Sequence, residues 1–372
     1  MIFDELLAEI VQRGASDGFI TARAAPSIKV DGEIFALQPE ALDEEATREL
    51  VLSTMTQAQQ AQFLSNNECN YAVQSEAHGR FRLSAFIQRG RCALVVRRIQ
   101  TRIPRVAELG LPPIVTDLAM LKRGLVMFVG GTGTGKSTSL AAMVGHRNRH
   151  SRGHILSIED PIEFLHDHAG CLITQREVGM DTESFEIGLQ NALRQAPDVI
   201  MIGEVRSAST MQHAMTFAET GHLCLCTLHA NNANQALDRI LSFFPSQMHN
   251  QVWMDLSLTL KAMVAQQLLP STSGEGRVPV MEVMLNSALV ADHIRNGKVH
   301  LIKEVMAKST EQGMQTLDQS LLAAYREGLI SAEEAIRCAD SANDVRLGMK
   351  MHDKGTRSGG VASSVDLSID DS

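Results

Sequence analysis

A glycine-rich segment that ends in lysine and serine is the strongest chemical signal in this sequence. Residues 130–137 match the pattern G-x-x-x-x-G-K-[ST], with an apolar run before them and a helix-compatible stretch after them. Glycines let the backbone wrap around phosphates, and the amides that begin a helix point toward them. We expect an ATP-binding loop in which Lys136 contacts the β- and γ-phosphates and Ser137 holds Mg²⁺. The residues expected to bind ATP are Gly130, Gly131, Thr132, Gly133, Thr134, Gly135, Lys136, Ser137 and Thr138. A glycine-rich turn with this pattern arises by chance in about one such chain in a hundred.

Acidic residues end two later apolar runs. Residues 157–163 read Ser-Ile-Glu-Asp-Pro-Ile-Glu, and Glu204 directly follows the run 198–203. Open parallel sheets bind ligands at the carboxyl ends of their strands. Near a magnesium nucleotide, one carboxylate of the first group can position and activate the attacking water, and Glu204 is the candidate for a water-mediated Mg²⁺ contact. An acidic loop by itself is more often a solvated surface feature, so the neighbouring phosphate loop is what favours the functional interpretation.

Two histidines flank a fourth apolar run, which covers residues 222–228. His222 opens the run and His229 follows it. Beside a γ-phosphate, a histidine can sense the bound nucleotide or donate a hydrogen bond in the transition state. A lone histidine is more often a packed or surface residue, and two that flank one strand leave both interpretations open.

The pattern of apolar runs predicts the elements that must position these residues. Near-continuous apolar runs at 124–130, 154–158, 198–203 and 222–228 are separated by helical stretches. Such runs are typical of parallel strands covered on both faces, so we expect a doubly wound α/β domain. From about residue 250 to 345 the pattern predicts mainly helices, including one over residues 251–269.

The first hundred residues predict a small α/β domain with an antiparallel sheet. A helix is expected from Phe3 to Val11, and Asp31-Gly32 predicts a hairpin turn. Residues 79–88 alternate as a half-buried strand, with Arg82 on its polar face, and the next predicted strand carries Arg97. The prolines and glycines of the following connector indicate a domain boundary. The expected division is 1–100, a linker at 101–115, an ATPase core at 116–270, a mainly helical part at 271–349 and a disordered Gly/Ser/Asp-rich tail at 350–372.

Composition excludes several classes of protein. The 34 Lys and Arg against 43 Asp and Glu give a net charge of −9, which disfavours nucleic-acid binding as a main function. The N-terminus has no signal-peptide pattern, and no apolar run reaches the roughly 18 residues that a membrane span needs. The six scattered cysteines fit neither a disulfide framework nor a zinc site. We therefore expect a cytoplasmic protein without a direct membrane span.

The motifs together resemble the secretion ATPases of the type II secretion and type IV pilus group. The phosphate loop, IEDPIE, GEVR and TLHAN occur in the family's order, and the similarity extends to about residue 345, closest to the pilus retraction ATPases. The resemblance implies a homo-hexameric ring of subunits with a PAS-like N-terminal domain, a RecA-like ATPase domain and nucleotide between them. It also implies roles for several residues: Glu163 as catalytic glutamate, Glu204 as Walker B glutamate, His222 and His229 as the histidine-box residues, and Arg82 and Arg97 as arginines that reach phosphate. From the residues alone, these arginines would be interpreted as a solvated face.

Three features of the sequence indicate which group within that family it resembles. Gly131 replaces a proline common in the phosphate loop, and the tetracysteine insert of many assembly ATPases is absent. The retraction motif AIRNLIRE corresponds to Leu289–Asn296, which keeps only Ile294 and Arg295. We therefore expect an accessory role in pilus retraction beside a second retraction ATPase, with an inner-membrane platform protein as a further partner. A nucleotide-binding adaptor whose own turnover is dispensable is the alternative. A small-molecule kinase is disfavoured because no acceptor-binding lid is evident.

Overall fold

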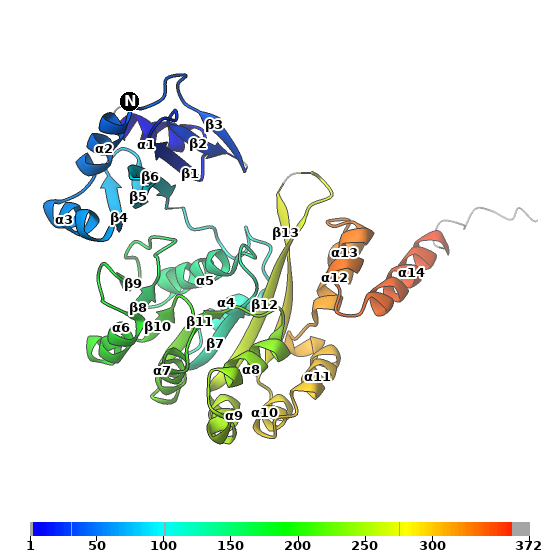
Figure 1. Cartoon of the computed structure of the whole chain (residues 1–372). Helices are drawn as coiled ribbons and strands as arrows, with labels where there is room; N and C mark the ends of the chain where they lie inside the picture. Colours follow the sequence, from blue (N-terminus) through cyan, green and yellow to red (C-terminus); the bar gives the residue numbers. More distant parts are fainter. Residues whose placement is uncertain (1–2, 31, 100–101, 275, 359–372) are drawn as a thin grey trace, which may run out of the picture. The chain divides into compact units, whose positions relative to one another are not determined.

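A computed structural model describes residues 3–30, 32–99, 102–274 and 276–358, with side chains to His352 at the C-terminal end (Figure 1). The chain divides into two compact units. One consists of Met1–Ile103 with Ile162–Asp167, and the other of Pro104–Pro161 with the chain from His168 onward. Both are α/β units, which confirms the fold class predicted from the sequence: an N-terminal sheet domain followed by a domain built on a mainly parallel sheet.

The N-terminal unit is built on an antiparallel sheet of six strands within the described residues, in the order β3-β2-β1-β6-β5-β4. Its strands are β1 Asp17–Thr21, β2 Ser27–Val30, β3 Glu33–Ala36, β4 Glu68–Ser75, β5 Gly79–Gln88 and β6 Arg91–Arg98, and its helices are α1 Phe3–Gln12, α2 Glu44–Ser53 and α3 Gln57–Asn66. The expected helix at the N-terminus, the hairpin at 27–36 and both arginine-bearing strands are confirmed; Asp31 itself lies outside the described residues. Alternate side chains of β5 are buried, with Phe81 and Leu83 fully so.

The second unit contains a seven-stranded sheet in the described part of the chain, in the order β13-β12-β7-β11-β10-β8-β9. Its strands are β7 Gly124–Val129, β8 Gly153–Glu159, β9 Cys171–Glu177, β10 Val199–Ile202, β11 Leu223–Leu228, β12 Leu260–Pro270 and β13 Arg277–Leu285. All neighbouring pairs are parallel except β12 with β13. The four predicted apolar runs form β7, β8, β10 and β11, and the parallel sheet expected from them is confirmed.

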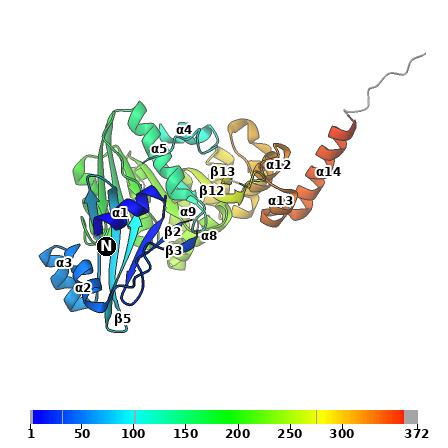
Figure 2. The same cartoon turned by 90° about the horizontal axis from the view of Figure 1, so that it is seen from above.

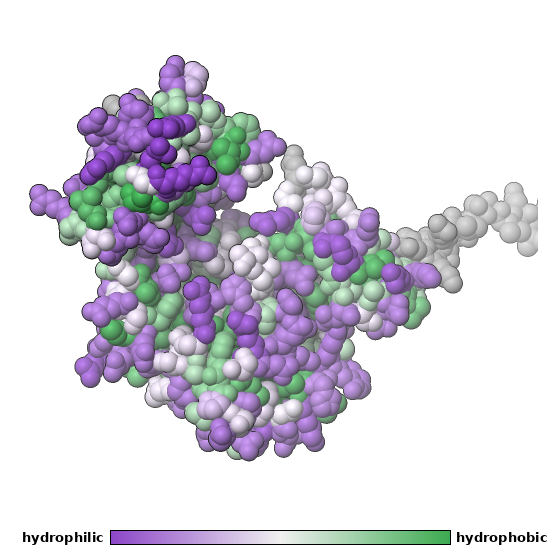
Figure 3. Space-filling view, in the orientation of Figure 1, coloured by the Kyte–Doolittle hydropathy of each residue, from purple (hydrophilic) through white to green (hydrophobic). Residues whose placement is uncertain are grey.

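Helices cover both faces of this sheet (Figures 1 and 2). They are α4 Ile114–Ala119, α5 Lys136–His150, α6 Phe185–Ala192, α7 Ala208–Glu219, α8 Ala233–Ser242, α9 His249–Thr259, α10 Ala288–Arg295 and α11 Ile302–Lys308. The remaining helices, α12 Leu317–Arg326, α13 Ala332–Cys338 and α14 Ala342–Ser358, pack together, with α12 against β13. Along β7, Leu125 and Met127 pack in the core beneath α6 to α11, whereas Val126 and Phe128 pack beneath α4 and α5. Because both faces are buried, the strand reads as a continuous apolar run. The surface in view is mainly hydrophilic (Figure 3).

The structure corrects two expectations about the C-terminal third of the chain. The helix predicted over 251–269 ends at Thr259, and residues 260–270 form β12, which pairs with β13 along its length. A strand buried on both faces has no period-2 pattern, so its apolar run is indistinguishable from a buried helix by periodicity. The irregular tail was expected from residue 350, but α14 extends to Ser358, and residues 359–372 lie outside the described part of the chain. None of the described helices is long and apolar enough to cross a membrane.

A candidate site for nucleotide binding and hydrolysis

The glycine-rich segment forms a loop between the end of β7 and the start of α5. Gly135 has a φ of 86°, a conformation that glycine adopts without strain. A Cβ at Gly130 would lie 2.7 Å from the backbone oxygen of Gln266, so no larger residue fits there. At Gly131, a Cβ would meet nothing closer than 3.9 Å. The loop therefore needs glycine at Gly130 and Gly135 but tolerates a side chain at Gly131.

Lys136 is the first residue of α5 and its side chain folds over the loop. Its Nζ donates to the carbonyl oxygens of Gly130 at 2.9 Å and Gly131 at 2.6 Å, and the residue is buried. Gly135 is the N-cap residue of α5 and brings no capping side chain, so no cap side chain competes with phosphate oxygens for the first amides of the helix. The ammonium group and these amides provide the positive charge that a polyphosphate requires.

Gln266 supports this loop from β12, a position that the sequence analysis missed. The Oγ of Ser139 in α5 donates to Gln266 Oε1 at 2.7 Å, and both residues are buried. Ala265 pairs with Val129 in the sheet, so the next residue, Gln266, lies beside the beginning of the loop. The residue was missed because the segment was predicted as helix; only the assignment of residues 260–270 as a strand next to β7 would have indicated it.

Glu204 and His229 meet at the carboxyl end of the same sheet. Glu204 follows β10 and His229 follows the neighbouring strand β11. His229 Nε2 lies 3.1 Å from Glu204 Oε1, and the Glu204 side chain is only 18% exposed. Arg206 Nη2 lies 2.7 Å from the other carboxylate oxygen, and this hydrogen bond raises the pKa of Arg206. The carboxylate thus has a partner on each oxygen, as expected for an oriented acidic group.

The two strand ends are also joined through the backbone. Thr227 Oγ1 donates to the carbonyl oxygen of Gly203 at 2.6 Å, and the amide of Val205 donates to Thr227 O at 2.9 Å. On the other side of β11, the amide of Gly130 donates to Leu228 O at 3.3 Å. The loop that begins at Gly130 and the two residues after β10 and β11 therefore share one edge of the sheet, as the sequence predicts.

His222 lies at the opposite edge. It precedes β11, and its carbonyl oxygen accepts the amide of Gly124, the first residue of β7, at 3.0 Å. Parallel strands run in one direction, so these amino ends lie a strand length away from the loop at Gly130. The structure does not bring His222 to the phosphate loop of its own unit, and its role in nucleotide binding stays a prediction.

The acidic segment 157–163, at the end of β8, belongs partly to each of the two units. Glu159 ends β8 and is buried, where its carboxylate accepts Ser157 Oγ at 2.6 Å and Gln175 Nε2 at 3.1 Å. Glu163 is exposed and belongs to the segment Ile162–Asp167, which groups with the N-terminal unit. Its predicted catalytic role stays a prediction.

The two candidate arginines are cross-strand neighbours in the N-terminal unit. Arg82 on β5 and Arg97 on β6 are directly opposite in the sheet register, so their side chains leave the same face. Arg97 Nε lies 2.8 Å from Oδ1 of Asp17, a buried carboxylate that also accepts Ser16 Oγ at 2.8 Å. Asp17, which the sequence analysis did not select, therefore orients the Arg97 guanidinium, although most of that side chain is exposed.

The oxygen atoms near the phosphate loop suit Mg²⁺ as a bound ion. No group of three or more His, Cys, Asp or Glu among the described residues could hold a metal ion. Mg²⁺ is usually bound by one or two protein oxygens together with substrate phosphates and water, so it does not require such a group. Ser137 in the first turn of α5 and Glu204 after β10 offer hard oxygen ligands at the edge of the sheet where the phosphate loop lies. Both residues are compatible with the predicted Mg²⁺ contacts.

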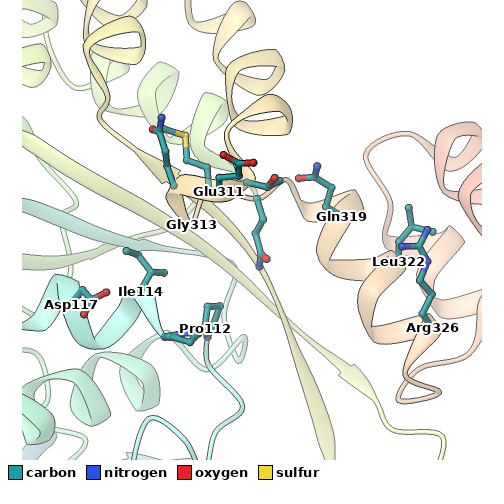
Figure 4. A pocket seen from close by; sticks show the side chains of 13 residues that line it. Pro112, Ile114, Asp117, Glu311, Gly313, Gln319, Leu322 and Arg326 are labelled. Carbon is teal, nitrogen blue, oxygen red and sulfur yellow. The ribbon is translucent and has the colours of Figure 1, made fainter.

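A cavity of about 710 Å³ lies elsewhere in this unit (Figure 4). It is lined by residues from the start of α4, including Asp117, and by the segment 310–326, including Glu311 and Arg326. No residue of the phosphate loop lines it, so it is separate from the site described above.

A phosphate loop after the first strand of a mainly parallel sheet, with an oriented glutamate at a neighbouring strand end, defines a P-loop nucleoside triphosphatase. Residues 1–337 match the family described as "Type II/IV secretion system protein", and the chain belongs to this family. The chain is therefore an ATPase of the secretion family, as the sequence analysis expected.

Several relatives of this chain are type IV pilus ATPases. The chain is 60% identical to the type IV pilus ATPase PilU of Pseudomonas aeruginosa, covering 94% of this chain and 92% of the relative. It is 37% identical to the retraction ATPase PilT of the same organism, over 90% and 97% of the two chains. Among solved structures, the pilus retraction motor PilT with bound ADP has a TM-score of 0.88 and 36% identity, covering 93% of this chain and 99% of that one. The resemblance to type IV pilus retraction ATPases is thus confirmed.

Proposed function

We propose that this chain is a mechanical ATPase that assists type IV pilus retraction and twitching motility. It acts as a homo-hexameric ring at the cytoplasmic base of the pilus machine, peripheral to the inner membrane, where it contacts a PilT-like retraction ATPase and the platform protein. The observation that carries this proposal is the pairing of Glu204 with His229 beside an intact phosphate loop, in a chain 60% identical to a pilus ATPase.

Each residue of the site has a proposed part in hydrolysis. Lys136 and the first amides of α5 bind the β- and γ-phosphates, and Mg²⁺, held by Ser137 and Glu204, supplies charge neutralisation when bound. Glu163 positions and deprotonates the attacking water. His229 fixes the orientation of Glu204 through the 3.1 Å contact.

Arginines from the N-terminal domain complete the proposed site. Arg82 and Arg97 place positive charge on the phosphates, which stabilises the charge spread over the phosphoryl group in the transition state. Because they belong to a separate domain, hydrolysis is coupled to domain movement. His222 contacts nucleotide or its surroundings only from a neighbouring subunit of the ring, since it lies at the far edge of its own sheet.

The altered retraction motif supports the accessory role. Residues 289–296 correspond to the motif, and most of them form α10. The retained Ile294 is fully buried and therefore belongs to the core. Leu289, at a position where the motif is changed, is 52% exposed. The surface offered by this helix thus differs from the family motif apart from Arg295. A chain with this surface is expected to work beside a second retraction ATPase.

The test replaces the gene with the Glu204→Ala form in cells with and without an active PilT partner, and measures twitching and surface piliation. If pili accumulate and twitching fails while the partner is active, hydrolysis by this chain contributes to retraction. If twitching survives Glu204→Ala but fails when the protein is deleted, the alternative adaptor function is correct. Immunoblots of the variant must show wild-type abundance.

A further inference from the structure

Glu282 is a buried carboxylate that the proposed hydrolysis does not use. It lies on β13 and is only 3% exposed. One oxygen accepts the backbone amide of Ala233 at 2.7 Å. Ala233 is the first residue of α8, and Asn232 is the N-cap, with its side chain accepting the amide of Gln235 at 2.9 Å. The start of α8 is therefore held from two sides, by its own cap and by a carboxylate from the sheet.

The position of Glu282 in the sheet connects it to the catalytic edge. Glu282 pairs with Ala265, Ala265 with Val129, and Val129 with Leu228, so these residues form one row across four strands. Leu228 is followed by His229. The chain then passes the ends of β7 and β12, which lie between β11 and β13, and reaches Ala233 beside Glu282. The carboxylate thus holds the far end of the short loop that carries His229.

Charged groups from the C-terminal part of the chain act electrostatically on this carboxylate. Lys303 Nζ lies 2.8 Å from Asp340 and 3.7 Å from Asp318, and these three groups act electrostatically on Glu282. Burial raises the pKa of Glu282 to about 7; the Ala233 amide and Lys303 oppose this rise, whereas Asp340 and Asp318 add to it. The group therefore changes its charge in the neutral pH range.

We infer that Glu282 is a positioning residue that fixes His229 against Glu204 by clamping the start of α8. This inference rests on the role of His229 in the proposed function. An ionised carboxylate is a stronger acceptor for the first amides of a helix than a neutral one, because the helix N-terminus carries partial positive charge. The clamp is tighter when Glu282 is ionised. The phosphate loop is supported separately by Gln266 and α5, so the clamp affects turnover rather than nucleotide affinity.

The first test measures steady-state ATPase kinetics of the full chain with Glu282→Gln. We expect kcat to fall about fivefold or more while KM for ATP changes less than about twofold, since a hydrogen-bond acceptor is weakened and no phosphate contact is touched. The Glu282→Asp variant keeps the charge and should recover part of the loss. The matched control is Glu304→Gln, an exposed glutamate on α11, which should leave both constants unchanged.

The second test combines Glu282→Gln with His229→Ala. If Glu282 acts through His229, the double variant is no slower than His229→Ala alone. If Glu282→Gln slows the His229→Ala protein by its full single-variant factor, the two residues act independently and the inference is wrong. If His229→Ala is slow while Glu282→Gln matches the wild type, the inference fails and the proposed role of His229 stands. Wild-type turnover in His229→Ala instead overturns that role and, with it, the inference.

A third measurement needs neither a variant nor hydrolysis. Hydrogen exchange of the peptide that covers residues 229–236 is followed in the wild-type chain from pH 6 to 8.5 and corrected for the intrinsic exchange rate. We expect protection of the α8 start to increase through about pH 7 relative to peptides of α7, because ionised Glu282 accepts the Ala233 amide more strongly. Global unfolding becomes easier over the same range, so the α7 peptides provide the reference for it. Equal protection throughout this range would overturn the clamp.

Discussion

His229 Nε2 lies 3.1 Å from Glu204 Oε1, so the ends of two adjacent parallel strands are joined by side chains at the edge where the phosphate loop lies. Because Arg206 occupies the other carboxylate oxygen, Glu204 has little rotational freedom. In an ATPase of the secretion family, this places an oriented acid at the edge of the sheet where the phosphate loop lies.

His229→Ala removes one of the two groups that orient Glu204. We expect turnover to fall at least about tenfold, with ATP affinity nearly unchanged, because misorientation of a transition-state contact lowers kcat more than binding. Phosphate release and binding of a fluorescent ATP analogue measure the two effects. The control is His213→Ala, which removes a half-buried histidine of α7. A weakened affinity with unchanged turnover would contradict the assignment.

Gln266→Leu tests the support of the phosphate loop from β12. The change leaves the buried Ser139 hydroxyl without its acceptor, which costs about 1–3 kcal/mol of unfolding free energy. Nucleotide affinity should also decrease because the loop loses its fixed neighbour. Urea unfolding and nucleotide titration provide the measurements. Gln267 is half-buried and lies on the opposite face of the strand, so Gln267→Leu should change neither stability nor nucleotide affinity. Equal effects of the two substitutions would refute a specific role for Gln266.

Asp17→Asn tests whether the orientation of Arg97 matters. The substitution keeps the size of the side chain but removes the charge that holds Arg97 Nε at 2.8 Å. If Arg97 reaches phosphate, the turnover of Asp17→Asn should fall about two- to tenfold. The turnover of Arg97→Ala should then fall at least as far. Arg13→Ala breaks an exposed helical ion pair in the same unit and serves as the control. Normal turnover in Arg97→Ala would mean that this arginine is only part of a solvent-exposed face, as its strand pattern alone indicates.

The raised pKa of the buried Glu282 carboxyl group should make the stability of the folded chain depend on pH. Burial raises its pKa in the folded chain to about 7, from the usual glutamate value of 4.5, so between these values the native state binds the proton more tightly than the unfolded state. Stability contributed by this group is therefore full below about pH 4.5 and is lost as pH rises through 7, by about 3 kcal/mol in total. Urea unfolding at pH 5 and pH 8 should show this loss in the wild type and not in Glu282→Gln. An identical loss in both proteins would refute the assignment.

The sequence could predict the phosphate loop, the antiparallel N-terminal sheet and the four central strands, because each has a local pattern. The strand β12 could not be recognised in this way, since burial on both faces removes the alternation that marks a strand. Gln266 and Glu282 were missed because their contacts join distant parts of the chain. Gln266 bonds Ser139, 127 residues away, and Glu282 bonds the amide of Ala233, 49 residues away. His222 and His229 look equivalent in sequence, and only the strand direction separates them to opposite edges.

The most direct test of the central claim compares phosphate release by the purified wild-type chain and its Glu204→Gln variant, with Mg²⁺ and saturating ATP. Glutamine keeps the size of the side chain and can still contact His229, so folding and ATP binding should persist. We predict Mg²⁺-dependent release by the wild type and a rate at least about 100-fold lower in the variant. Equal rates in the two proteins, with equal ATP binding, would contradict hydrolysis at this site and leave the adaptor function as the better account.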